Sequence, residues 1–486
     1  MSTFDDLKRL TKHSAIYGLG HILSRGIGFL LLPLYTNVLS PAEYGLVALV
    51  FTFIAFVNIL FLYGLDSAFL RFYSLEEGAD GKRKVLSTTC LLNVFTSILF
   101  FAILYFLSGP LSHFVLGRSE IQSLLKMAAG IVLLDTLSTF PYLLLRMEER
   151  SSRFILYRFV SIMLNVGLNI LLVAHLKMGV QGVFISNLIA SAFTLIILLP
   201  IIWSRLTPLV SMTLAKEFLK FGLPFIPAGL ASMTMELIDR YMLNNMKGLE
   251  IVGIYNAGYK LGLFMLLVVM AFKFAWQPFF LSLAREESRA KKSFAAVLTY
   301  FLLASGFLHL AVSFFVDDLV RLSLRGVSVF GSDYWAGTQV VPVILLAYII
   351  MGVYLIFLPG IYLKKKTKFV PLFTGTGAVV NVVCNLLFIP RWGMMGAAWA
   401  TLLGYLAMAG LMYATVQKFY PIRYQFARVA RIVLVAAALF GVWQWIGHSL
   451  ISRVLLLFLG FPIGLAATGF FTRAERNRMR GILGMR

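Results

Sequence analysis

A few ionisable side chains lie inside long apolar stretches of this chain, where they could bind an anion or carry a proton. Arg25 stands about twelve residues into the first stretch and Lys260 about ten residues into a later one. At about 1.5 Å per helical residue, both reach the middle of a bilayer core about 30 Å thick. A charge at that depth is costly and faces a cavity or a partner. Both cations suit a phosphate or an acidic sugar, and neutralisation by a nearby carboxylate is the alternative.

Two further polar residues share a helical face with Arg25. His21 comes one turn before Arg25, and Tyr17 comes one turn before His21. Residues four apart lie one above the other on a helix. We therefore expect Tyr17, His21 and Arg25 to line a common cavity.

A second charged group lies in a later apolar stretch, as Glu236, Asp239 and Arg240. Glu236 and Arg240 are four residues apart, so a structural ion pair between them is one interpretation. In the other, Glu236 or Asp239 takes up a proton or cation and releases Arg240 to bind an anion. Asp135 is another candidate for ion coupling, with a buried hydrogen bond to a neighbouring helix as its structural alternative.

Signs of a metal, redox or catalytic centre are missing from the sequence. The six His residues show no metal-ligand spacing, and Cys90 and Cys384 form no CxxC motif. We expect no metal, no cofactor and no catalytic residue.

The composition indicates whether the helices that carry these residues lie in water or in a lipid bilayer. Of 486 residues, 60% are hydrophobic and only 13% are charged, yet the net charge is +22. A nucleic-acid-binding protein would be basic and polar, whereas this chain is basic and apolar. The composition indicates a membrane protein and excludes a nucleic-acid partner.

Apolar stretches of about 20 residues, bounded by charged or turn residues, predict about 14 transmembrane helices. Their approximate ranges are 13–36, 42–64, 84–108, 121–143, 152–174, 182–203, 223–244, 250–273, 293–316, 340–363, 369–389, 396–417, 429–447 and 450–471. Within them, Arg158 and Lys273 fall near a span end, where we expect their side chains to extend to the membrane surface.

The basic residues are distributed unequally between alternate connections. Of the 43 Lys and Arg residues, 30 lie on the side that holds both termini, and six lie on the other side. Cytoplasmic loops carry the excess of Lys and Arg. The bias therefore predicts that both termini are cytoplasmic, and the basic runs need no partner beyond anionic lipid.

A weak internal repeat divides the chain. The pair Asn165 and Asn169 recurs as Asn381 and Asn385, and the motif starting at Gly179 recurs at 393–396. Because each copy holds an even number of spans, the repeats are parallel. We expect two six-helix lobes, residues 1–222 and 223–424, related by a pseudo-two-fold axis along the membrane normal. Residues 425–486 add two C-terminal helices and a basic tail. Convergent helix-turn patterns are the alternative.

Four short motifs occur at matching places in the predicted helices: Leu39-Ser-Pro-Ala-Glu-Tyr-Gly, Gly253-Ile-Tyr-Asn-Ala-Gly, Trp276-Gln-Pro-Phe and Gly393-Met-Met-Gly-Ala-Ala-Trp-Ala-Thr. With them the chain resembles the Wzx-type polysaccharide-unit flippases of the multidrug/oligosaccharidyl-lipid/polysaccharide exporter superfamily. The resemblance implies transfer of an isoprenoid (undecaprenyl) diphosphate-linked oligosaccharide across a bacterial cytoplasmic (inner) membrane. It implies membrane lipid, this lipid-linked sugar and polysaccharide assembly enzymes as partners, and places residues 429–471 beside the cleft, where they would bind the lipid tail.

Two other functions fit parts of the sequence. A lipid II flippase, which moves a peptidoglycan precursor, would share all the spans. A membrane-embedded glycosyltransferase or polysaccharide polymerase would act on the same lipid carrier, but it needs catalytic groups on a large external loop. The longest such loop, 317–339, contains no Asp-x-Asp motif, so we expect a transporter and not an enzyme.

Overall fold

The computed structural model describes residues 29–116, 121–283, 286–324, 327–446, 449–473 and 475–477. Within these ranges the regular structure is helical, apart from one short antiparallel hairpin of β1 (Ser323–Leu324) and β2 (Val327–Ser328). The predicted all-α class is therefore confirmed. Most of the first expected span, with Tyr17, His21 and Arg25, lies outside the described residues.

The first half of the chain forms a helical bundle that ends in a short surface helix. Its elements are α2 (Leu32–Val38), α3 (Pro41–Leu62), α4 (Leu65–Leu75), α5 (Ala79–Phe106), α6 (Ser108–Leu116), α7 (Gln122–Met147), α8 (Ser151–Asn169), the π-helical turn η2 (Ile170–His175), α9 (Gly179–Trp203) and α10 (Met212–Gly222).

The second half repeats this organisation and then adds a small C-terminal unit. Its elements are α11 (Phe225–Lys247), α12 (Leu249–Ser282), α13 (Glu287–Arg321), the 3-10 helix η3 (Ser332–Val340), α14 (Val341–Leu363), the 3-10 turn η4 (Thr367–Phe369), α15 (Val370–Gln417), α16 (Phe426–Ile446), α17 (Leu450–Leu455), the π-helical turn η5 (Leu456–Gly460) and α18 (Phe461–Ala467).

The described part of the chain contains eleven helices that are long and apolar enough to cross a membrane. The number is twelve if α10 and α11, which are bent by 41° relative to each other, form one span. α15 contains two of the expected spans, because Gly393 leaves helical geometry at φ 54° and ψ −129° and separates two helices there. The chain is thus a multi-pass membrane protein, and the expected number of fourteen is not confirmed.

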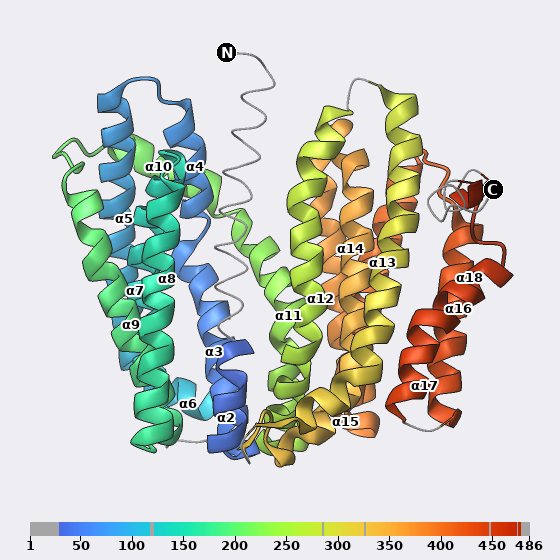
Figure 1. The fold of residues 1–486 in the computed structure, drawn as a ribbon. Helices are drawn as coiled ribbons and strands as arrows, with labels where there is room; N and C mark the ends of the chain where they lie inside the picture. Colours follow the sequence, from blue (N-terminus) through green and yellow to red (C-terminus); the bar gives the residue numbers. More distant parts are fainter. Residues whose placement is uncertain are drawn as a thin grey trace.

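The helices form two bundles with a small unit at one side. Figure 1 shows the N-lobe (α2–α9) at the left, the C-lobe (α11–α15) at the right and α16–α18 at the outer edge of the C-lobe. The chain passes between the lobes through α10, which packs on α4 by its buried Phe218.

The two lobes share local details that the sequence repeat predicts. Gly179 and Gly393 both adopt positive φ, at 56° and 54°, at the turns before corresponding helices. In both Asn pairs the second amide donates to the first: Asn169 to Asn165 over 3.1 Å and Asn385 to Asn381 over 3.0 Å. Repeated backbone and side-chain geometry at matched positions supports a common origin of the lobes.

The lobes meet at one end, which we call the closed end, through backbone contacts between α3 and α12. A Cβ on Gly45 would lie 2.0 Å from the carbonyl oxygen of Leu249, and a Cβ on Gly253 would lie 1.9 Å from that of Pro41. Since the offset from Pro41 to Leu249 equals that from Gly45 to Gly253, the contact is reciprocal, as a two-fold axis requires.

The connection between α13 and α14 completes the closed end. Tyr334 in η3 donates to the carbonyl of Leu39 over 2.8 Å, and Asn37 donates to that of Ser328 over 2.9 Å. Both hydrogen bonds join the C-lobe to the N-lobe, so the closed end is tied by this connection as well as by the helix contact.

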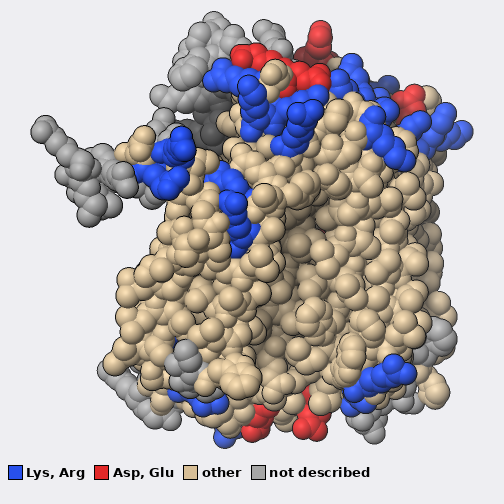
Figure 2. Space-filling model, turned by 90° about the vertical axis from the view of Figure 1, so that its right-hand side faces the viewer, with Lys and Arg blue, Asp and Glu red and all other residues tan. Residues whose placement is uncertain are grey.

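Charged side chains gather at the two ends of the molecule. Figure 2 shows a broad band of uncharged residues between an upper rim rich in Lys and Arg and a lower rim with fewer charges. A band of this kind is what the apolar interior of a bilayer requires of a protein surface.

Candidate functional site

A cavity of about 670 Å³ lies between the lobes. Its lining comes from α2, α3, α7, α8 and α9 of the N-lobe and from α11 and α12 of the C-lobe. The volume falls in the range of about 300–1,000 Å³ that small-molecule sites occupy. The cavity is therefore the candidate functional site.

The floor of the cavity lies toward the closed end and holds Lys260. The Lys260 ammonium lies 5.3 Å from the ring centre of Tyr44 and 5.9 Å from that of Tyr35. Tyr35 is fixed by its hydroxyl, which donates to Asn169 over 2.8 Å. Among the residues that the structure describes, no carboxylate lies within 4.0 Å of Lys260. Its ammonium is thus held by aromatic faces, which attract cations.

The N-lobe wall of the cavity is polar. Asp135 of α7 accepts a hydrogen bond from Ser191 of α9 over 2.7 Å, and Thr194 donates to Ser161 over 2.8 Å. The other polar residues on this wall are Thr52, Asn58, Ser138, Thr139, Tyr142, Arg158, Asn165 and Asn187. Hydroxyl and amide groups both donate and accept hydrogen bonds, so this wall can bind a ligand with many hydroxyl groups.

Arg158 gives the N-lobe wall a cation that we expected at the membrane surface. The structure places it on the cavity wall, with its guanidinium 4.2 Å from the ring centre of Tyr142. Position along a helix shows only depth, whereas the cavity extends along α8 toward its N-terminal half, so the contact of Arg158 with the membrane surface stays a prediction. The polar positions Ser161 and Asn165, one and two turns away, were the signal of a polar face.

The C-lobe wall contains an ion pair. Arg240 donates to Asp239 over 2.5 Å and to the backbone carbonyl of Glu236 over 2.5 Å. Tyr255 donates to the other oxygen of Asp239. A structural ion pair was one of the two interpretations, but its carboxylate is Asp239 and not Glu236. The four-residue spacing favoured Glu236 as the partner of Arg240. Asp239 is the partner instead, because Tyr255 holds it beside the Arg240 guanidinium.

These contacts separate the candidate residues by access. Lys260, Arg240, Glu236 and Asp135 line the cavity. Asp239 does not line it and is only 1% exposed. Their roles in binding and coupling stay predictions.

Residues 10–284 match the family described as "Polysaccharide biosynthesis protein". The chain belongs to the polysaccharide biosynthesis protein family. This match confirms the resemblance drawn from the four short motifs.

Solved structures with the same fold include transporters of two kinds. The lipid II flippase MurJ in its inward closed conformation is 16% identical with a TM-score of 0.75, over 93% of this chain and 98% of that one. An inward-facing multidrug resistance MATE family transporter of the MOP superfamily is 13% identical with a TM-score of 0.67, over 84% and 96%. A variant of the Vibrio cholerae MATE transporter VcmN is 16% identical with a TM-score of 0.58, over 85% and 96%. No curated protein matches the chain.

In this family member the C-terminal helices do not lie beside the cleft as the resemblance implied. α16–α18 pack on α13 around a buried cluster that includes Phe314, Trp443 and Phe461, and none of the residues that line the cavity comes from them. They occupy the edge of the C-lobe away from the N-lobe (Figure 1). The expected position was wrong because the apolar face of α13 is their packing surface.

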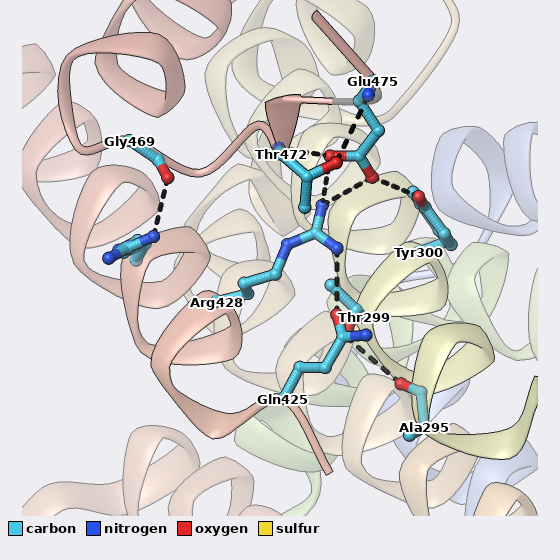
Figure 3. A network of polar contacts seen from close by, with 9 residues as sticks. Ala295, Thr299, Tyr300, Gln425, Arg428, Gly469, Thr472 and Glu475 are labelled. Atoms are coloured by element: carbon cyan, nitrogen blue, oxygen red, sulfur yellow. Dashed lines mark hydrogen bonds and ion pairs between the residues drawn. The ribbon is translucent and has the colours of Figure 1, made fainter. Parts of the chain in front are cut away.

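An ion pair at one end and a hydrogen bond at the other fasten this unit to α13. Arg453, whose side chain is 7% exposed, pairs with Asp318 and donates to the carbonyl of Phe314 over 2.8 Å. At the other end, Arg428 makes two bonds to Glu475, over 2.8 and 3.0 Å, and Tyr300 of α13 donates to the same carboxylate (Figure 3). The C-terminal unit is therefore attached to the C-lobe at both ends.

The Glu475 carboxylate is held ionised by this network. Partial burial raises the pKa of Glu475. Hydrogen bonds from Tyr300, from the backbone and side chain of Thr472 and from Arg428 lower the pKa by more than burial raises it, to about 2. Figure 3 shows these groups converging on Glu475 from α13, α16 and the tail. Charge-assisted hydrogen bonds of this kind are stronger than neutral ones.

Proposed function

We propose that this chain is a flippase that moves an isoprenoid diphosphate-linked oligosaccharide from the cytoplasmic to the outer leaflet by alternating access. The observation that carries the proposal is the cavity between the lobes, which combines the ammonium of Lys260 with a wall of hydroxyl and amide groups. The family match and the transporter fold support the same conclusion.

The two parts of the lining suit the two polar parts of such a substrate. Lys260, and beyond the described residues Arg25 with His21 and Tyr17, would bind the diphosphate. The N-lobe wall around Asn165, Asn187 and Ser191 would bind the sugar hydroxyls. The isoprenoid tail would stay in the bilayer, because its transfer into a polar cavity is unfavourable.

The basic residues set the proposed orientation. The connections at the closed end are those with few Lys and Arg residues, so we place this end outside the cytoplasm and both termini inside. The structure then corresponds to the state that receives substrate from the cytoplasm. Residues 1–222 and 223–424 would be the two moving lobes, with residues 425–486 carried by the second, in a bacterial inner membrane that also holds the polysaccharide assembly enzymes.

Asp135 is the strongest of the three candidates for ion coupling. It lines the cavity, and Ser191 donates a hydrogen bond to one of its two carboxylate oxygens. Asp239 is closed off by Arg240 and Tyr255. Glu236 lines the cavity and remains the second candidate.

Depletion of the protein tests the proposal. We expect a lipid-linked oligosaccharide to accumulate in the inner leaflet and surface polysaccharide to disappear. Lys260→Ala and Arg25→Ala are expected to give the same phenotype at normal protein levels, whereas Lys247→Ala, a cation outside the cavity, is expected to be silent. Normal polysaccharide in both cavity variants would contradict the proposal.

A lipid II flippase is the second candidate, favoured by the fold shared with MurJ. Accumulation of lipid II on depletion would establish it. Loss of polymer with undiminished lipid transfer would instead point to a glycosyltransferase or polymerase.

A further inference from the structure

Three tyrosines meet at the closed end of the cavity. Tyr44 of α3 packs against Tyr35 of α2 at 5.9 Å between ring centres, and edge to face against Tyr334 of η3 at 5.8 Å. All three side chains are at most 4% exposed. Since Tyr334 belongs to the C-lobe and the other two to the N-lobe, the cluster is itself a contact between the lobes.

Lys260 adds a second contact between the lobes from the cavity side. It projects from α12 of the C-lobe toward the rings of Tyr35 and Tyr44 in the N-lobe. Lys260 and both rings line the cavity, whereas Tyr334 does not. One ammonium group thus faces the ligand space and also holds the N-lobe side of the closed end.

We infer that Lys260 couples occupation of the cavity to opening of the closed end. With the cavity empty, its ammonium holds Tyr35 and Tyr44 against the C-lobe. A phosphate bound at Lys260 draws the ammonium away from the rings, because a charge-assisted hydrogen bond to an anion is stronger than attraction to an aromatic face. The release step rests on the proposed function, whereas the contact of Lys260 with the rings does not.

The position of the tyrosine cluster explains how one side chain can affect the whole closed end. Tyr44 lies next to Gly45, which touches the backbone of α12, and Tyr334 donates to the carbonyl of Leu39 in the turn before α3. A displacement of Tyr44 therefore acts on the helix contact and on the η3 contact together.

Thiol labelling at the closed end measures this coupling. Thr36 is 4% exposed and its carbonyl contacts Gly331 across the lobes, so Thr36→Cys reports opening by its rate of reaction with a maleimide. Cys90 and Cys384 are replaced by Ser in the full-length purified protein. Thr299→Cys, buried in α13 far from this contact, reports general unfolding.

The variants separate the charge from the size of the side chain. Loss of a desolvated cation–π contact is expected to raise the open population, and with it the labelling of Thr36→Cys, about tenfold in Lys260→Met. Lys260→Arg keeps the charge, and Tyr44→Phe keeps the ring, so both are expected to label like the parent. Tyr44→Leu is expected to behave like Lys260→Met. Arg158→Met is the matched control, because Arg158 contacts Tyr142 and not the floor.

Inorganic pyrophosphate tests the release step. At saturating concentration it is expected to speed labelling of the parent protein and to leave Lys260→Met unchanged. Unchanged labelling in both Lys260→Met and Tyr44→Leu, with Thr299→Cys protected, would overturn the coupling even if Lys260 is needed for transport. Faster labelling in both variants without a pyrophosphate effect would overturn the release step. Intact transport in Lys260→Met would instead count against the proposed function.

Discussion

Gly45 of α3 and Gly253 of α12 occupy equivalent positions on the two sides of the closed end, and neither leaves room for a Cβ. The added carbon would lie 2.0 or 1.9 Å from a backbone oxygen of the opposite helix. Backbone atoms cannot move aside as a side chain can, so the helices themselves must separate. The two positions are therefore expected to respond alike to substitution.

Gly45→Ala and Gly253→Ala are each expected to open the closed end and to destabilise the protein by about 1–3 kcal/mol, as overpacking does. Thermal unfolding and labelling of Thr36→Cys provide the measurements. Gly167→Ala and Gly410→Ala are the controls, because nothing lies within 4 Å of a Cβ at either glycine. A clear effect of one substitution with none of the other would argue against the reciprocal contact.

Asp239→Asn is expected to lower stability by about 3–5 kcal/mol, because it leaves the buried guanidinium of Arg240 without its carboxylate. Asp135→Asn keeps an acceptor for Ser191, so its effect on stability is expected to stay below about 1 kcal/mol while transport loses its dependence on the driving ion. Denaturant unfolding and vesicle transport assays separate the two. Equal destabilisation by both substitutions would contradict the assignment of a structural role to Asp239 and of a cavity role to Asp135.

Arg453→Met is expected to loosen α16–α18 from α13, since the guanidinium bonds both Asp318 and the carbonyl of Phe314. Hydrogen exchange across residues 449–473 would show the loss of protection. The double variant Arg453→Met with Asp318→Leu is expected to recover part of it, because removing both partners leaves no carboxylate without its cation. A loss of protection in the double variant equal to the sum of the losses in Arg453→Met and Asp318→Leu would indicate that the ion pair contributes nothing of its own.

The contact of Glu475 with Arg428 is expected to weaken in acid. The folded-state pKa of about 2 lies below the ordinary value of 4.5, so the carboxylate stabilises the folded state above pH 4.5 and this contribution disappears as the pH falls toward 2. Because the network lies at the surface, we expect about 1 kcal/mol. Glu475→Gln should lower the melting temperature at pH 7 and make no difference near pH 2. A constant difference across that range would contradict the assignment.

The sequence predicts the membrane helices well because the bilayer selects for long apolar segments whatever their neighbours are. It also predicts the two lobes, because the motif that starts at Gly179 recurs at Gly393. Both glycines adopt positive φ at equivalent turns. The cavity wall is less predictable. Arg158 could be placed at a depth but not on a face, and the choice between Glu236 and Asp239 as partner of Arg240 depends on Tyr255 from another helix.

The position of the C-terminal helices shows the same limit. Their hydropathy identifies two spans, but only the apolar surface of α13, with Phe314 at its centre, determines where they pack. The ion pairs of Arg453 and Arg428 join residues more than forty positions apart in the chain, and no spacing rule reaches that far.

The glycine contact between α3 and α12 has an evolutionary consequence. It is made from backbone atoms, whereas the polar wall is made from side chains such as Asn165 and Ser191. Substitutions that adapt the wall to a different ligand therefore leave this backbone contact between the two halves untouched. A lineage can acquire a new cargo one residue at a time without rebuilding the machinery that moves it.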